Sequence, residues 1–124
     1  MPARFRDRLG SGFFVTIGEP DACLALYPAA IWNEFCARLE AAPVKDARYR
    51  AFVRHLFAHT EEVSCDNQGR LLIPPVLRAW ARIEKDVTSI GSLTRVEVWA
   101  HDRYAAVTAG AGDLADYRFE LGLY

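Results

Sequence analysis

The residues best suited to chemistry lie in one short turn, Asp66-Asn67-Gln68-Gly69-Arg70. An arginine directly after a tight turn can present its planar guanidinium to a guanine edge or to a phosphate. The side-chain amides of Asn67 and Gln68 can donate hydrogen bonds to the same groups. A simpler reading is that Arg70 pairs with Asp66 to brace the turn, while the amides serve only as turn formers. The sequence leaves both readings open.

Four arginines outside this turn form a second set of candidates for phosphate contacts, which supply most non-specific affinity for nucleic acid. They are Arg4, Arg6, Arg78 and Arg82. The alternative for each of these arginines is that it lies on a solvated helix face and contacts no nucleic acid. The chain has 15 Lys and Arg against 16 Asp and Glu, so attraction to nucleic acid has to be local rather than global.

His55 and His59 are spaced i, i+4, with Glu62 near, which superficially offers a metal site. The HExxH order of zinc proteases is absent, because residues 56–58 are Leu-Phe-Ala. We therefore expect both histidines on a helix surface and no metal site. P-loop, GxSxG and dinucleotide-binding glycine patterns are also absent, so we expect no cofactor, no small-molecule substrate and no enzymatic activity.

The composition is that of one ordinary globular domain, with 124 residues, 52% of them hydrophobic and 25% charged. No run approaches the roughly 18 apolar residues of a membrane span, and the basic N-terminus lacks a following apolar stretch. We expect a cytoplasmic protein without a membrane partner. Cys23, Cys36 and Cys65 are odd in number and lack CxxC spacing, so we interpret them as small buried or half-buried apolar residues.

Helical periodicity dominates the middle of the chain. Apolar residues at spacings of three and four predict one helix near 31–39, ended by Pro43, and a second that begins at an Asp46 N-cap. A short turn between them predicts an antiparallel helical hairpin. Alternating and β-branched segments around it predict strands, and two further helical segments follow. The strands are expected at 63–65, 70–73, 87–90 and 95–99, and the helices near 77–81 and 101–107.

A shift of 72 residues aligns the chain with itself without gaps. It places Pro2 on Pro74, Arg6 on Arg78 and Trp32 on Tyr104, and it matches 24–27 with 96–99. The ordered pattern of proline, short helix, strand, turn, strand and helix predicts two copies of one structural unit. The second copy also begins with a strand, turn and strand at about 61–72, which the first copy lacks.

These residues resemble the MraZ family, which is built from two SpoVT/AbrB-type repeats. The resemblance rests on the DxxxR run and the following IPPVLR at 66–78, on 14–16 with 24–28, and on Val96-Glu97-Val98-Trp99. It implies an α+β fold, a swapped-hairpin β-barrel with pseudo-twofold symmetry flanked by helices. We expect the first repeat at 1–42, a linking helix at 43–60, the second repeat at 61–107 and a C-terminal tail at 108–124.

The resemblance also implies a sequence-specific, DNA-binding transcriptional regulator of the division and cell-wall gene cluster. Such a regulator is nucleoid-associated and binds promoter direct repeats as a ring of several subunits. The expected DNA-binding residues are Arg70, Gln68, Asn67, Arg78, Arg4 and Arg6, with Asp66, Gly69 and Pro74 shaping the motif. The alternatives are an assembly module whose DNA binding is impaired by the incomplete first repeat, and a regulatory antitoxin of the wider SpoVT/AbrB type.

The repeat leads to an expectation about the gene, because Met1 stands at the place of Ile73, directly before a proline kept in both copies. An N-terminally truncated chain would give this pattern. In-frame codons upstream of Met1 should then encode about a dozen residues with an alternating strand and a Gly-Arg pair, since a missing partner strand leaves backbone groups unpaired. The extended chain should melt at higher temperature and bind DNA more tightly. An in-frame stop codon directly upstream would contradict this expectation.

Overall fold

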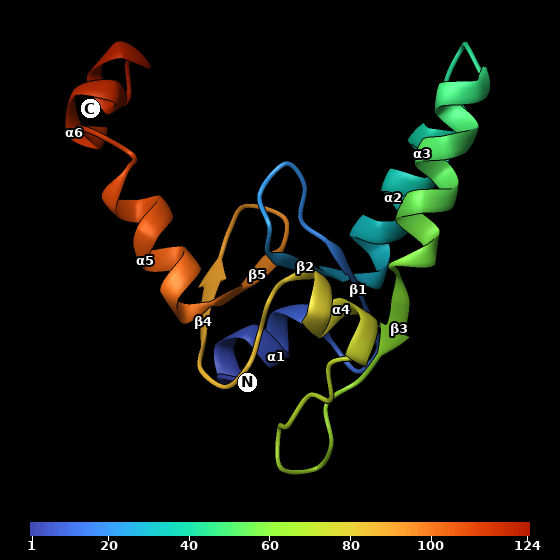
Figure 1. Ribbon diagram of the computed structural model, residues 1–124, viewed down its shortest axis with the longest axis horizontal. Helices are drawn as coiled ribbons and strands as arrows, with labels where there is room; N and C mark the ends of the chain where they lie inside the picture. Colours follow the sequence, from blue (N-terminus) through green and yellow to red (C-terminus); the bar gives the residue numbers. More distant parts are fainter.

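The computed structural model describes residues 1–124 and has α+β architecture, with one antiparallel sheet in the strand order β3-β1-β2-β5-β4 (Figure 1). The strands are β1 Phe13–Ile17, β2 Leu24–Pro28, β3 Glu61–Val63, β4 Val87–Gly91 and β5 Val96–Ala100. The helices are α1 Ala3–Leu9, α2 Ala29–Glu40, α3 Ala47–Ala58, α4 Pro75–Trp80, α5 His101–Ala109 and α6 Leu114–Glu120. The sheet is open at β3 and β4, so the expected closed barrel is not confirmed. None of the helices has the length and apolar character required to span a membrane.

The two copies meet where β2 pairs with β5. Ala25 lies opposite Glu97, its own counterpart 72 residues away. On either side, Leu24 pairs with Val98 and Leu26 pairs with Val96. Val96 and Val98 are the repeat equivalents of Leu24 and Leu26, so exchanging the two copies leaves the pairing unchanged. A pseudo-twofold axis therefore passes between Ala25 and Glu97. It relates the unit α1-β1-β2-α2 to the unit α4-β4-β5-α5 and confirms the predicted repeat.

The gapless alignment is wrong at one strand. Val15 pairs with Leu26, whereas the repeat partner of Leu26, Val98, pairs with Ser89. Val15 therefore corresponds to Ser89 rather than to Val87. The segment between α4 and β4 is longer than the equivalent segment between α1 and β1, which displaces β4 by two residues along the chain. The β4–β5 turn is two residues shorter than the β1–β2 turn, so β5 returns to the 72-residue shift. Because two residues are one full strand period, the side chains keep their faces of the sheet.

A second correction concerns the strand expected at 70–73. These residues belong to no strand, and the preceding strand β3 begins at Glu61, earlier than expected. β3 crosses from the second copy to pair with β1 of the first, but no strand lies opposite 70–73. A β-segment needs a neighbour to satisfy its backbone groups, and the prolines that follow lack an N–H donor. A short apolar run between a turn and two prolines could not supply that neighbour.

The main core lies on the sheet face covered by α1 and α4. Val96 and Val98 of β5 are buried there together with Leu24 and Leu26 of β2. The short helices contribute apolar side chains to the same cluster, Phe5 and Leu9 from α1 and Leu77 from α4. The helices are therefore held mainly by burial, since helices this short are unstable alone.

The helical hairpin of α2 and α3 forms an arm that rises from the sheet (Figure 1). The Asp46 side chain accepts from the Tyr49 N–H at 2.9 Å, which confirms the predicted N-cap. Tyr49 Oη donates to the Leu39 carbonyl at 2.8 Å, and the rings of Trp32 and Phe57 lie 5.8 Å apart. These contacts confirm the predicted hairpin and bury Trp32 at its base.

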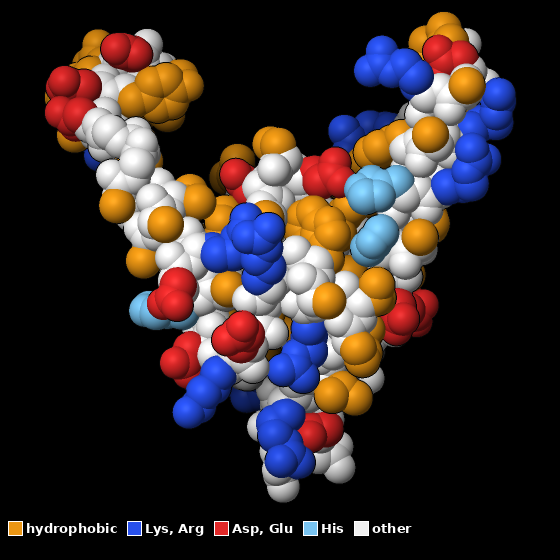
Figure 2. Space-filling view, in the orientation of Figure 1, with side chains coloured by type: hydrophobic (Ala, Val, Ile, Leu, Met, Phe, Trp, Pro, Cys, Tyr) orange, Lys and Arg blue, Asp and Glu red, His pale blue; other side chains and the backbone are white.

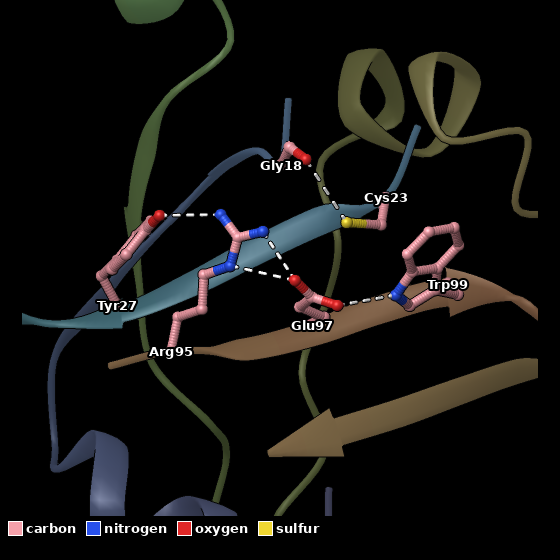
Figure 3. Close-up of polar contacts among 6 residues, drawn as sticks. All are labelled: Gly18, Cys23, Tyr27, Arg95, Glu97 and Trp99. Atoms are coloured by element: carbon pink, nitrogen blue, oxygen red, sulfur yellow. Dashed lines mark hydrogen bonds and ion pairs between the residues drawn. The ribbon is translucent and has the colours of Figure 1, made fainter. Parts of the chain in front are cut away.

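A half-buried polar network lies on the other face of β5 (Figure 3). Arg95 donates to Glu97 Oε2 through Nη2 at 2.6 Å and to Tyr27 Oη through Nη1 at 2.9 Å. Trp99 Nε1 donates to the other oxygen of Glu97 at 3.1 Å. Burial alone would lower the pKa of Arg95, but the hydrogen bonds to Tyr27 and Glu97 outweigh it and raise that pKa. Glu97 thus binds Arg95 and Trp99 directly, and Arg95 extends the network to Tyr27 of β2 beside the pseudo-twofold axis.

The cysteines confirm the interpretation as apolar residues. Cys23 is fully buried, and its Sγ donates to the Gly18 carbonyl at 3.7 Å. Burial, reinforced by the nearby Glu97 carboxylate, raises the pKa of the Cys23 thiol to about 12. Cys36 and Cys65 are half-buried. The Cys23 thiol therefore stays protonated near neutral pH and is a poor nucleophile.

The network predicts a specific loss of stability. Glu97→Ala should lower the free energy of unfolding by about 1–3 kcal/mol, because it leaves the Arg95 guanidinium and the Trp99 N–H without their acceptor. Urea unfolding followed by fluorescence measures the change. Replacing both Arg95 and Glu97 with Met should recover the part of the loss that comes from the unpaired guanidinium. As a control, Glu19→Ala removes the exposed pair with His55 and should cost less than about 1 kcal/mol. Equal losses for the Glu97 and Glu19 variants would contradict this account.

Candidate nucleic-acid interface

The turn at 66–70 is built around the Asp66 carboxylate. Its Oδ1 accepts from the backbone N–H groups of Gln68 and Arg70 at 2.9 and 2.8 Å. The Asp66 N–H donates to the Arg70 carbonyl at 2.8 Å, and the Gly69 N–H donates to the Asp66 carbonyl at 2.9 Å. The Arg70 backbone bond, then the Arg70 side chain and the Gln68 N–H, hold the pKa of Asp66 below its usual range. The turn therefore has a fixed shape that depends on an ionised aspartate.

Arg70 is braced and exposed at the same time. Its Nε donates to Asp66 Oδ2 at 2.9 Å, while 74% of its side chain is accessible to solvent. Bracing of the turn and contact with nucleic acid are thus compatible in one geometry. The bond from Nε to Asp66 orients the guanidinium, and the Nη groups carry no bond to the protein. A fork oriented in this way loses less entropy when it binds a planar acceptor or a phosphate.

The turn lies at the end of a loop that extends away from the sheet, on the side opposite the two helical arms (Figure 1). Asn67 and Gln68 are exposed at its tip. Figure 2 shows basic and acidic side chains together at the tip of this projection. An open hollow of about 500 Å³ lies beside the turn, lined by Asp66 and Arg70 and by Leu71 and Leu72. The projection carries the expected turn residues into solvent.

Gly69 connects this turn to the first copy. It is buried with φ at +77°, a conformation that other L-residues rarely adopt. A Cβ at Gly69 would lie 2.8 Å from Cζ of Arg6, whose Nε donates to the Met1 carbonyl at 3.1 Å. Arg6 of α1 therefore packs against the back of the turn. Sequence reasoning missed this contact, because nothing local relates residues 63 positions apart.

The other predicted basic residues lie on or next to the two equivalent helices. Arg4 places its guanidinium 4.7 Å from the centre of the Phe5 ring on α1. Arg78 Nη2 donates to the Glu84 carbonyl at 3.3 Å, and Arg82 follows α4 with a φ of 55°. Pro74 is the N-cap of α4, as Pro2 is of α1. Arg6 and Arg78 occupy equivalent positions in the two copies, and each donates to a backbone carbonyl of its own copy, which fits a bracing role for this pair.

His55 lies on the surface of α3 and His59 is the C-cap residue of that helix, both away from the turn. His55 Nε2 lies 2.6 Å from Glu19 Oε1, so His55 ties the helical arm to the β1–β2 loop. His59 Nδ1 donates to the His55 carbonyl at 2.8 Å. Groups of three or more His, Cys, Asp or Glu side chains that could hold a metal ion do not occur in the structure.

The lowered pKa of Asp66 predicts how the turn responds to acid. The turn should remain formed as pH falls to the usual aspartate range, and it should lose its order only when pH falls through the lower pKa of Asp66, because the ionised carboxylate accepts its bonds. An NMR titration of the Gln68 and Arg70 amide shifts measures the midpoint. An Asp66 midpoint above 3.8 would contradict the geometry.

Comparison with known proteins places the chain in one family. The model of the MraZ protein family, whose description adds "antitoxin-like", matches residues 1–55 and again residues 56–114. A Clostridium acetobutylicum protein named "Transcriptional regulator MraZ" is 37% identical over 99% of this chain and 88% of its own length. Proteins of the same name from Acetivibrio thermocellus and Moorella thermoacetica are 46% and 44% identical, over 99% and 84% of this chain and 88% and 72% of their own lengths. The chain therefore belongs to the MraZ family.

Proposed function

We propose that this chain is a sequence-specific, DNA-binding transcriptional regulator. Its relatives carry the name of a transcriptional regulator, and the projecting turn supplies groups suited to duplex DNA. We further propose that it acts in the cytoplasm on the nucleoid, at direct repeats in the promoter of the division and cell-wall gene cluster. Several subunits, arranged as a ring, would each engage one repeat.

The observation that carries the proposal is the exposed but pre-oriented guanidinium of Arg70. Major-groove guanine presents O6 and N7 in one plane, which matches the arginine fork. Asp66 fixes the direction of that fork at 2.9 Å, and Asn67 and Gln68 lie beside it with exposed amides. The turn therefore combines a base-reading group with groups that can contact base or phosphate.

Charge explains why several subunits are needed. The formal net charge of one chain is −1, so a single subunit has little long-range attraction for DNA. Linked subunits on adjacent repeats raise the effective concentration of each further contact and can multiply modest affinities. Arg4 is the proposed phosphate contact that adds to each turn.

One observation favours a second candidate, an assembly module with impaired DNA binding. Residues 70–73 lie outside the sheet, so the segment that follows the turn lacks the support of a neighbouring strand. A turn that is supported on only one side holds its arginine less rigidly, and a less rigid arginine recognises DNA more weakly. DNA binding measured as a function of salt separates the two candidates, because phosphate neutralisation gives a linear fall of log K with log salt.

The DNA-binding proposal predicts distinct effects for Arg70. Arg70→Ala should weaken binding to a promoter fragment and remove about 1–3 kcal/mol of discrimination against scrambled DNA, because a bidentate base contact is lost. Arg38→Ala is the matched control, since Arg38 is an exposed arginine on the helical arm, away from the projecting turn. Fluorescence anisotropy at several salt concentrations measures both.

The outcomes distinguish the roles of the turn. A loss of affinity that is equal on promoter and scrambled DNA, with a salt slope reduced by about one, would assign Arg70 to a phosphate instead of a base. Binding unchanged by Arg70→Ala would remove the turn from the interface. The absence of salt-dependent binding by the unaltered chain would reject the regulator and leave the assembly module.

A further inference from the structure

The last part of the chain exposes an unusual density of large apolar side chains. Each of six residues between 114 and 124 is at least 53% exposed: Leu114, Tyr117, Phe119, Leu121, Leu123 and Tyr124. Helix α6 has no buried residue. Contiguous apolar surface of this kind on a folded chain marks an interaction site. From the sequence we expected only a C-terminal tail at 108–124.

Comparison of the two copies shows that this surface lacks a covering helix. Helix α5 is the counterpart of α2, and α2 is covered by α3, whose Phe57 ring lies 5.8 Å from that of Trp32; Trp32 is only 4% exposed. Helix α5 has no buried residue, and α6 lies beyond its far end instead of folding back along it (Figure 1). The two arms diverge from the sheet, so α6 does not reach the α2–α3 arm of its own chain.

The charges of the two arms are complementary. Helix α3 carries Arg48, Arg50 and Arg54 and no acidic residue. The segment 113–124 carries three acidic side chains against the single Arg118. Figure 2 shows basic side chains along the α2–α3 arm and acidic side chains beside apolar ones at the end of the α5–α6 arm. Complementary charge of this kind selects a partner and its register.

The basic arm also contains a hollow that an apolar side chain can enter. A cavity of about 190 Å³ lies between the hairpin and the sheet, with walls that include Trp32, Phe35, Phe52 and Leu56. At about 30 Å³ per water molecule, this space is several times the volume of a water and admits a bulky side chain. Phe52 on its wall is 42% exposed, so the hollow opens to solvent.

We infer that α6 of one copy of this chain docks on α3 and the adjoining hollow of the next copy. This inference rests on the proposed assembly of several subunits and assigns the surface that builds it. The contact joins two different surfaces, so it propagates from head to tail and closes a ring when the rotation allows. Apolar residues of α6 supply the buried area, while Asp116 and Glu120 face the arginines of α3.

The apolar half of the contact is tested by sedimentation velocity over a range of concentrations. The double variant Phe119→Ser, Leu121→Ser should weaken self-association at least about 100-fold and shift the mass toward the 13.9 kDa of one chain. Both side chains are exposed, so the circular dichroism spectrum should stay unchanged and show that each chain remains folded. Leu93→Ser is the matched control, because Leu93 is 96% exposed on a different turn and should leave the assembly intact. An unchanged assembly mass for the double variant would overturn the inference.

The charged half is tested by mixing two variants. One carries Arg48→Glu and Arg54→Glu on α3, and the other carries Asp116→Arg and Glu120→Arg on α6. Each alone should fail to assemble, since like charges meet at every contact. A one-to-one mixture should assemble, because the reversed α3 of one variant then meets the reversed α6 of the other. Assembly of either variant alone, or no assembly of the mixture, would overturn the docking of α6 on α3.

The design separates this inference from the proposed function. An unaltered chain that sediments at 13.9 kDa at every concentration would overturn both the assembly and its surface. An unaltered chain that assembles while the α6 variants assemble equally well would overturn the surface alone. Salt-dependent binding to the promoter fragment, measured on the same samples, reports the DNA-binding proposal independently of either result.

Discussion

The pairing of β2 with β5 is the interaction on which the rest of the structure depends. It is the only ladder that joins the hairpin of the first copy to the hairpin of the second. Each hairpin alone would be a marginal two-stranded element, whereas the joined strands bury Leu24, Leu26, Val96 and Val98 in one core. The face opposite this core is secured at the same point by Glu97, which holds Arg95 and Trp99. Polar and apolar contacts thus converge on the pseudo-twofold axis.

This arrangement explains how the projecting turn gains its support. The turn belongs to the second copy, but β3, the strand before it, pairs with β1 of the first copy, and Arg6 of the first copy packs against Gly69. Its position therefore depends on both copies being held in register. Local bonds around Asp66 then fix the direction of Arg70. The shape of the turn is local, whereas its placement is a property of the whole sheet.

The sequence predicted those features that depend on local chemistry or on the repeat. The Asp46 cap, the helical hairpin and the β2–β5 equivalence follow from spacing and from the 72-residue shift. It failed where a partner decides the outcome: 70–73 is a short apolar segment after a turn, which is typical of a strand, but it has no neighbouring strand. A gapless shift likewise could not reveal the compensating change of two residues around β4, because Val87-Thr88 repeats Val15-Thr16 by chance in the wrong register. The contact of Arg6 with Gly69 leaves no local signal, whereas Asp113 before Leu114 is an N-cap pattern that could have indicated α6.

We propose that the two copies present the turn at 66–70, and not another exposed turn, to duplex DNA. A photo-crosslinking side chain placed at Gln68, and in a second chain at Leu93, tests this most directly with a labelled promoter fragment. Both positions are exposed at turn tips, so their reactivity toward a bound duplex is comparable. The account predicts crosslinks from position 68 that salt abolishes and that unlabelled promoter DNA displaces, with none from position 93. Crosslinks from position 93 alone would contradict it.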